Sequence, residues 1–305
     1  MTATLTPQVQ PVASAAEACA LLAELGEAAE VLAGGSWIMR AGLRGEPFKP
    51  HYLALTGLSE LSGMRQDGGR VAIGALTTHA ELATLPDHGG LQVLIEAARL
   101  SAFPQVRNVA TVGGNLRSLD FAQADLVPAL LAAEATIVLR RAGGTERLPI
   151  ADYHQSRHGR PADELVVGVE LAGQPARSST YERLTIRASG EYAVAALAIS
   201  IDRTPDGAIS AARIAVGSVE PEARLLTEAP QLLAGQLPTA ELVAALGQAI
   251  AAEISPRDGI DAPAWYRKAV LLAMTQRALA RLLEPGGNAA TSAATNAAAN
   301  TTEAQ

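Results

Sequence analysis

Two short segments of the chain carry a pair of glycines followed by a small polar residue. The first consists of Val31, Leu32, Ala33, Gly34, Gly35, Ser36, Trp37 and Ile38, and the second of Thr111, Val112, Gly113, Gly114 and Asn115. Each begins with apolar residues typical of a strand, so we expect a strand fragment that leads into a glycine turn. Glycine lets a ligand approach without a Cβ in the way, and successive backbone N–H groups in a turn can converge on an anion. These first and second glycine turns therefore suit the two phosphates of one pyrophosphate.

A simpler interpretation is that each glycine pair only turns the chain, because short glycine motifs also occur by chance. Neither turn matches the dinucleotide motif G-x-G-x-x-G or the P-loop motif. Asp125 follows the second turn, and its carboxylate either accepts hydrogen bonds from ligand hydroxyls or caps the next helix. Trp37 either covers the edge of a bound ring or fills the core, and we favour the core because buried aromatic residues mostly pack. The residues alone thus indicate two backbone clamps that fit a dinucleotide.

Composition excludes several classes of protein. The 305 residues suggest about two domains, and 49% hydrophobic residues suffice for a substantial core. The net charge of −7 argues against nucleic acid as a partner, because binding to phosphates needs a basic face. The chain has no apolar run long enough to span a membrane and no signal-peptide pattern at its N-terminus. We therefore expect no membrane span and a cytoplasmic location.

The sequence offers few ligands for a metal. One cysteine, Cys19, cannot form an intrachain disulfide or hold an iron–sulfur cluster, which needs about four thiolates. His154 and His158 are four residues apart, but their basic segment near a proline is typical of an exposed loop or short helix. We therefore expect no metal site in this chain, and we find no acid–base pair that would mark a catalytic residue.

The hydrophobic pattern predicts an α+β protein whose first domain has two parts. Residues 8–33 form a strand–helix–strand subdomain, in which Ser14 and Glu17 make a capping box and Gly26 ends the helix. Because such a crossover joins parallel strands, the first glycine turn should lie at the carboxyl end of a strand, where ligands bind in such sheets. The following strands and helices form a mixed α/β subdomain, with a hairpin at Gly143 and Gly144.

A change of pattern between residues 172 and 179 predicts a second domain. We expect a three-stranded antiparallel sheet from strands at 179–187, 193–202 and 208–218, followed by a helical layer at 223–234, 239–254 and 262–283. The first domain then covers residues 1–175 and the second covers 176–285. The tail at 286–305 is rich in Ala, Asn, Thr and Ser and has no large apolar residue to bury, which predicts disorder.

The sequence also resembles a known family, the FAD-binding medium subunits of molybdenum hydroxylases of the xanthine dehydrogenase and aerobic carbon monoxide dehydrogenase type. The resemblance covers roughly residues 5–284 and is carried, in the family's order, by AGGSWIMRAGLRG (33–45), IGALTTHAELA (73–83), PQVRNVATVGGNL (104–116), ADLVPALLA (124–132), DELVVGVEL (163–171) and WYRKAVLLAMTQRAL (265–279). Three features depart from the family pattern. Trp37 replaces a small or acidic residue, the stretch from Asn115 to Asp125 is one residue longer, and Arg183 stands where lysine is common.

The resemblance implies a non-covalently bound FAD with its pyrophosphate on the two glycine turns. It places Val31 to Ile38 on the pyrophosphate and adenine side, Asp125 near the ribityl hydroxyls, and Arg183 and Val166 near the isoalloxazine. It also implies two partners, a molybdopterin-binding large subunit and an iron–sulfur small subunit, in a heterotrimer or a dimer of heterotrimers. In such a complex, electrons pass from the iron–sulfur clusters through FAD to an external acceptor. A chain with one cysteine agrees with this division of cofactors.

Two other functions compete with electron relay. The chain could be a stand-alone FAD-dependent oxidase or dehydrogenase, although no acid–base constellation supports a substrate site of its own. It could also be an assembly module without a cofactor, which the intact glycine turns disfavour. The sequence specifies neither the organic substrate, which another chain would select, nor the terminal acceptor, which could be NAD, a quinone, oxygen or another compound.

Overall fold

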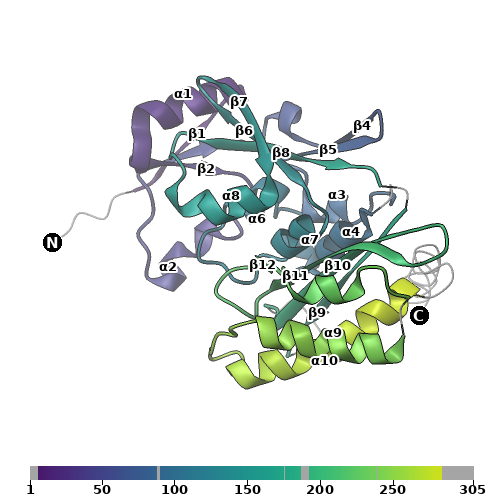
Figure 1. The fold of residues 1–305 in the computed structure, drawn as a ribbon. Coiled ribbons are helices and arrows are strands. Elements are labelled where there is room, and N and C mark those ends of the chain that lie inside the picture. Colours follow the sequence, from purple (N-terminus) through teal and green to yellow (C-terminus); the bar gives the residue numbers. More distant parts are fainter. Residues whose placement is uncertain (1–5, 88–89, 175, 187–191, 238, 284–305) are drawn as a thin grey trace, which may run out of the picture.

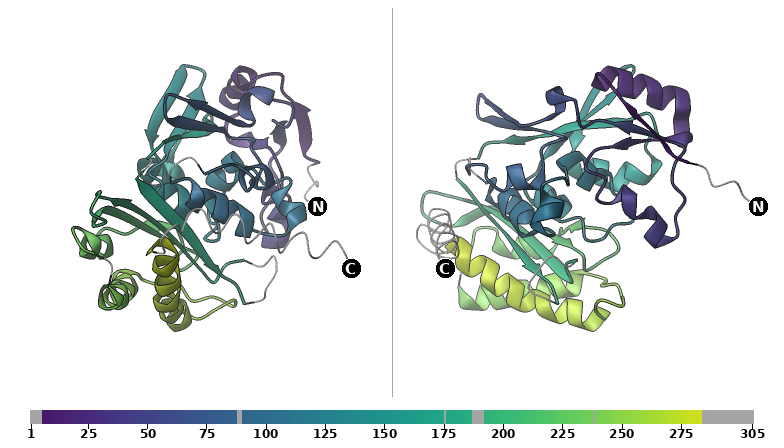
Figure 2. Two further views of the ribbon diagram at one scale, coloured as in Figure 1. Left: turned by 90° about the vertical axis from the view of Figure 1, so that its right-hand side faces the viewer. Right: turned by 180° about the vertical axis from the view of Figure 1, so that it is seen from behind.

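The computed structural model describes residues 6–87, 90–174, 176–186, 192–237 and 239–283, which form three β-sheets and their covering helices (Figure 1). A five-stranded and a four-stranded sheet enclose a layer of helices, and a further pair of helices covers the outer face of the four-stranded sheet (Figure 2). The predicted α+β class is therefore confirmed. No helix among the described residues is long and apolar enough to cross a membrane.

The N-terminal sheet has three parallel strands in the order β1 (Gln8–Pro11), β3 (His51–Ala54) and β2 (Ala29–Leu32). Helix α1 (Ala15–Leu25) joins β1 to β2, as predicted, and its apolar face buries Cys19 in the core of this subdomain. Ser14 caps α1 by accepting the N–H of Glu17, but the Glu17 carboxylate accepts the N–H of Ala13 instead of that of Ser14. The predicted capping box is thus only half formed.

The five-stranded sheet is antiparallel, and its order is β4 (Met64–Asp67), β5 (Arg70–Gly74), β8 (Leu165–Ala172), β6 (Thr136–Arg141) and β7 (Gly144–Pro149). Strands β6 and β7 form the hairpin predicted at Gly143 and Gly144. One face of this sheet carries Val71, Ile73, Ile137 and Val169 into the main core. Strand β8 matters for the site, because it delivers Val166 to the cavity described below.

The C-terminal sheet has four strands, not three. Its order is β12 (Arg224–Leu225), β11 (Ile209–Gly217), β10 (Ala195–Arg203) and β9 (Arg177–Leu184), all antiparallel. The helix predicted at 223–234 is wrong in its first half, because residues 224–225 pair with β11 and only the 3₁₀ helix η5 (Ala229–Leu233) follows. Helices α9 (Ala240–Glu253) and α10 (Ala264–Leu283) form the predicted helical layer. The tail predicted to be disordered lies outside the described residues.

Short helices lie between and beside the two larger sheets. They are α3 (His79–Leu82), α4 (Gln92–Leu100), α5 (Pro104–Arg107), α6 (Val112–Arg117), α7 (Leu126–Ala132) and α8 (Ile150–Ser156). Every residue of α7 is buried, since this helix packs on β10 and β11 as well as on α4 and α6. The remaining short helices are α2 (Ala41–Arg44), η1 (Gly26–Ala28), η2 (Ile38–Arg40), η3 (Ser59–Leu61) and η4 (Arg157–Gly159). This packing joins the two halves of the chain around the main core, which contains side chains of both larger sheets.

Candidate cofactor site

A cavity of about 810 Å³ opens where the two glycine turns meet the C-terminal sheet. Its size falls in the range of about 300–1,000 Å³ that is usual for ligand and cofactor sites. Most of the predicted site residues line it, namely Val31, Ala33, Gly34, Gly35, Ser36, Trp37, Ile38, Thr111, Gly113, Gly114, Asn115, Asp125, Val166 and Arg183. Two do not: Leu32 ends strand β2, and Val112 is fully buried. Segments far apart in the sequence thus converge on one cavity.

The first glycine turn follows β2 directly, as the sequence predicts. The N–H of Leu55 binds the carbonyl of Leu32 and fixes the end of the strand, and Gly35 then takes a positive φ of 67° that favours glycine. The backbone N–H groups of residues 34–37 donate to no acceptor among the described residues. Because this segment lines the cavity, these donors are available to a phosphate.

Gly34 lies where the first glycine turn touches the segment that leads into the second. A Cβ at Gly34 would lie 1.7 Å from the carbonyl oxygen of Val109 and 2.5 Å from its carbonyl carbon. Val109 precedes the second glycine turn, so only glycine allows the two backbones to approach this closely. The first glycine is therefore required by contact within the chain as well as by any ligand.

The second glycine turn is the start of helix α6 and not the end of a strand, which corrects the prediction. Thr111 caps the helix, since its Oγ1 accepts the N–H of Gly114 at 3.1 Å. The N–H groups of Val112 and Gly113 bind the carbonyls of Thr77 and Ala75, at 3.0 and 2.8 Å. The threonine was ambiguous, because it favours both strands and N-caps. The N–H donors of this turn are thus already bonded, and Gly114 lines the cavity without a Cβ, which would lie 3.0 Å from the Thr111 hydroxyl.

Asp125 and Arg183 form an ion pair at the cavity wall. The Arg183 Nε donates to Asp125 Oδ1 at 2.8 Å, and the hydroxyl of Tyr181 donates to the same oxygen at 2.8 Å. Asp125 precedes α7, but its side chain makes no capping hydrogen bond, so the helix-cap alternative is wrong. Instead, Asn115 Oδ1 accepts the N–H of Leu126 and ties α6 to α7. Burial raises the pKa of Tyr181 well above its ordinary value, which keeps this phenol a neutral donor.

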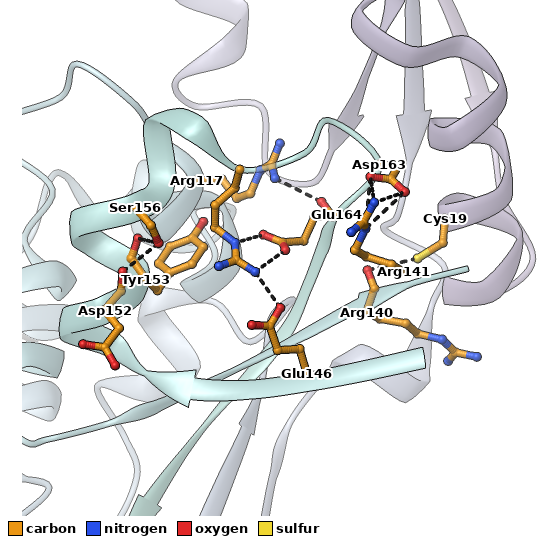
Figure 3. A network of polar contacts seen from close by, with 11 residues as sticks. Cys19, Arg117, Arg140, Arg141, Glu146, Asp152, Tyr153, Ser156, Asp163 and Glu164 are labelled. Carbon is orange, nitrogen blue, oxygen red and sulfur yellow. Dashed lines mark hydrogen bonds and ion pairs between the residues drawn. The ribbon is translucent and has the colours of Figure 1, made fainter. Parts of the chain in front are cut away.

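A polar network anchors the far end of α6 to Glu164, the residue before strand β8 (Figure 3). Arg117 donates to the carbonyl oxygen of Glu164 at 3.0 Å, and the buried Glu164 carboxylate pairs with Arg160 at 2.6 Å. Arg160 also pairs with Glu146 of β7 at 2.6 Å. Since Val166 follows Glu164 by two residues, this network sets the position of the second glycine turn relative to Val166.

Three aromatic residues from distant segments line the cavity together. The ring centroids of Trp37 and Phe121 are 4.2 Å apart, and Phe121 meets Tyr192 edge-on at 5.4 Å. The guanidinium of Arg44 lies 3.9 Å from the centre of the Trp37 ring. The preference for core packing of Trp37 is therefore wrong, because this side chain is partly exposed at the cavity. Phe121 and Tyr192 carry no local signal in the sequence, although Phe121 lies in the stretch that is one residue longer than the family pattern.

Other cavity residues were also missed from sequence. Glu30 precedes the first turn, and burial raises the pKa of its carboxyl group, which can accept hydrogen bonds from hydroxyls. His79 also lines the cavity, and Ile260 and Asp261 reach it from the loop before α10. Glu30 could have been predicted from the sequence, because it stands next to a turn that was expected to bind a ligand. The other three are brought in only by tertiary packing.

Comparison with known proteins identifies the family. Residues 6–172 match the family model described as the FAD binding domain in molybdopterin dehydrogenase, and residues 179–282 match the carbon monoxide dehydrogenase flavoprotein C-terminal domain. The chain belongs to this family of FAD-binding subunits. Within it, the chain is of the medium-subunit type found in molybdenum hydroxylases such as carbon monoxide dehydrogenase and xanthine dehydrogenase, and it is an oxidoreductase flavoprotein subunit.

Named relatives and a solved structure agree over nearly the whole chain. The carbon monoxide dehydrogenase medium chain of Hydrogenophaga pseudoflava is 32% identical, covering 87% of this chain and 93% of the relative. The 6-hydroxypseudooxynicotine dehydrogenase complex subunit alpha of Paenarthrobacter nicotinovorans is 31% identical, covering 88% and 92%. A structure of the Hydrogenophaga pseudoflava carbon monoxide dehydrogenase that lacks the Mo-pyranopterin moiety superposes with a TM-score of 0.82 over 90% of this chain and 96% of that chain, at 32% identity.

Proposed function

We propose that this chain is the electron-transfer subunit of a multi-subunit molybdenum hydroxylase, in which FAD receives electrons from an iron–sulfur subunit and passes them to an external acceptor. The observation that supports this most directly is the first glycine turn, where successive N–H groups that find no acceptor in the described part of the chain line a cavity of cofactor size. When bound, FAD supplies the redox chemistry, and the protein supplies binding and orientation.

The geometry suggests a role for each part of the site. We assign the pyrophosphate to the donors of residues 34–37, next to Gly114, whose missing Cβ leaves room for it. The ion pair of Asp125 and Arg183 would hold the ribityl and isoalloxazine side, with Val166 as an apolar wall. Leu32 and Val112, which do not line the cavity, are assigned to packing beneath the turns. The sequence-based assignment has both turns bind the pyrophosphate. In this assignment the first turn donates the hydrogen bonds and the second turn only leaves room.

We also propose that the FAD-binding domain covers residues 1–175 and that the second domain covers 176–285. The two matched family segments end at 172 and begin at 179, and strand β9 begins at Arg177. Both domains contribute to the cavity, because Arg183 and Tyr192 belong to the second.

An exposed apolar rim surrounds the cavity and suits a protein partner. It consists of Phe103, Val109, Ile186, Tyr192 and Ile260, which all line the cavity and expose 41% or more of their surface. Apolar side chains gathered around one opening mark interaction sites. We assign this rim to the iron–sulfur subunit, because a relay cofactor needs its electron donor close by. The names "medium chain" and "complex subunit alpha" of the relatives agree with such an assembly.

The purified chain should bind FAD at least about 100-fold more tightly than FMN, since FMN lacks the pyrophosphate and adenine that the first turn and Glu30 would hold. Heat-released flavin should run as FAD in chromatography, and titration of the stripped protein, followed by flavin fluorescence, should give the two affinities. Retention of FMN alone, or of no flavin after reconstitution, would contradict the proposed cofactor.

Mixing the FAD-loaded chain with its chemically reduced iron–sulfur subunit should reduce the flavin, as followed by absorbance in a stopped-flow instrument. Ile260→Asp, compared with the wild type at matched FAD occupancy, should weaken this association by about tenfold or more, because it places a charge in the apolar rim. The matched control is Leu237→Asp, which changes an equally apolar exposed residue that does not line the cavity. Oxidation of an organic substrate by the FAD-loaded chain alone, at the rate of the full complex, would support the stand-alone flavoenzyme instead.

A further inference from the structure

His79 occupies a fixed place beside the second glycine turn. It is the first residue of α3, whose N-terminus is closed by a complete capping box between Thr78 and Glu81. The backbone N–H of His79 binds the carbonyl of Ala110 at 2.9 Å, and Thr78 forms a β-bridge with Thr111. The residue is 3% exposed and is among those that line the cavity. Its position is therefore coupled to the turn that meets the cofactor.

The hydrogen bonds of Ser101 define the tautomer of His79. The Ser101 hydroxyl donates to the carbonyl oxygen of Ala98 at 2.8 Å, which uses its single proton. His79 Nδ1 lies 2.8 Å from the same hydroxyl oxygen, so Nδ1 must carry a proton and donate it. In a neutral imidazole the other nitrogen then has a lone pair and can only accept. The His79 Nε2 is therefore an acceptor.

This acceptor is buried and has no hydrogen-bond partner among the described residues. Burial, together with the positive charge of Arg107, lowers the pKa of His79 to about 4, so the ring is neutral at neutral pH. A buried polar atom without a partner is destabilising and rare in native structures, which usually supply a ligand, an ion or a water. Since His79 lines the cofactor cavity, a bound ligand is the partner that its location favours.

The neighbouring wall is anchored by the Arg107 guanidinium. Ala102 has a positive φ of 39°, which is unfavourable for a residue with a Cβ, and Arg107 holds it by donating to the carbonyls of Ser101 and Ala102 at 2.9 and 2.7 Å. Phe103 and Val106 continue this wall of the cavity. The lone pair of a neutral Nε2 selects an N–H or O–H donor and disfavours carbonyl or phosphate oxygens, whose own lone pairs would face it.

We propose that His79 is a specificity and positioning residue of the cofactor site, whose Nε2 accepts a hydrogen bond from an N–H or O–H group of the bound dinucleotide. The inference rests on the proposed FAD function. FAD carries such donors on both halves, in the flavin imide and ribityl hydroxyls and in the adenine amino and ribose hydroxyl groups. The half that supplies the donor is left to the experiment.

The ¹⁵N resonance of the His79 ring tests the hydrogen bond directly. The full chain, labelled with ¹⁵N-histidine, is titrated with FAD, FMN and ADP, and the His79 Nε2 signal is assigned as the one lost in His79→Gln. We expect FAD to shift this signal upfield, as an acceptor nitrogen does when it gains a donor. A shift with saturating FMN or ADP identifies the half that donates. If FAD binds by absorbance and the signal does not move, this inference is wrong while the proposed function stands; if FAD does not bind, the proposed function fails as well.

Two substitutions separate this role from a structural one. His79→Leu removes the acceptor at similar volume and should weaken FAD binding by about tenfold to 100-fold, consistent with one lost hydrogen bond in a buried site. The same variant should change the stability of the flavin-free chain little, because it removes an unpaired buried acceptor together with the hydrogen bond between Nδ1 and Ser101. His79→Gln keeps an acceptor at a similar reach and should recover most of the affinity. Equal FAD affinities for His79→Leu and the wild type would overturn the inference.

Discussion

Replacing Gly34 with alanine should abolish FAD retention and destabilise the FAD-binding half of the chain. The added Cβ would lie 1.7 Å from the carbonyl oxygen of Val109 and 3.1 Å from the backbone nitrogen of Ala110. Backbone atoms cannot rotate away as a side chain can, so the two glycine turns must separate. Overpacking of this kind costs about 1–3 kcal/mol or more, and here it also displaces the N–H donors that follow Gly34. The flavin-to-protein absorbance ratio and the thermal unfolding midpoint measure the two effects.

Other glycines of the same chain provide the controls. Gly57→Ala should match the wild type in both measurements, because nothing lies within 4 Å of its added Cβ. Gly114→Ala should reduce flavin retention with little loss of stability, since its Cβ would be close only to the Thr111 hydroxyl, at 3.0 Å. A Gly34→Ala protein that retains a full complement of FAD would show that the contact with Val109 can relax and that the first turn is not the pyrophosphate site.

Gly34 also illustrates what sequence reasoning could and could not supply about the site. The position of the first turn at the end of a parallel strand followed from local signals, namely an apolar run, a glycine pair and a preceding capped helix. The sequence suggested that a side chain there would block a ligand. The obstacle that the structure identifies is the backbone of Val109, 75 residues away, and no local pattern reports such a contact.

Elements of the fold that depend on contacts between distant residues were likewise not predicted. Long periodic segments such as α10 were placed to within about two residues, whereas β12 has only two residues, too few for a periodic pattern, and is recognised only by its pairing with β11. Thr111 could begin a helix or continue a strand, and its hydrogen bond to Gly114 decided between them. Phe121 and Tyr192 face the cavity only because three distant segments pack together, so their types alone gave no indication of a role.

Arg267 is fully buried, and its guanidinium makes hydrogen bonds to several segments of the chain. From helix α10 it donates to the carbonyl oxygens of Val194, Ser218 and Arg257 at 2.5, 3.2 and 3.1 Å, and it pairs with the carboxylate of Asp261 at 2.7 Å. A planar guanidinium can serve four acceptors in this way, and an ammonium group cannot reproduce its fork. Arg267 therefore fixes the start of β10 and the loop before α10 to one helix.

Substitution Arg267→Met should destabilise the chain by about 3–5 kcal/mol, because it leaves buried carbonyl groups and a partly buried carboxylate without their donor. FAD retention should fall as well, since Asp261 and Ile260 line the cavity and would lose their anchor. Urea unfolding followed by circular dichroism, with flavin occupancy measured on the same samples, gives both quantities. Lys268→Met is the matched control, because it makes a similar change at the next, exposed position of α10 and should be nearly neutral. Arg267→Lys should fall between the two. If Arg267→Met unfolds at the same urea concentration as Lys268→Met and still holds FAD, the arginine does not organise this wall of the cavity.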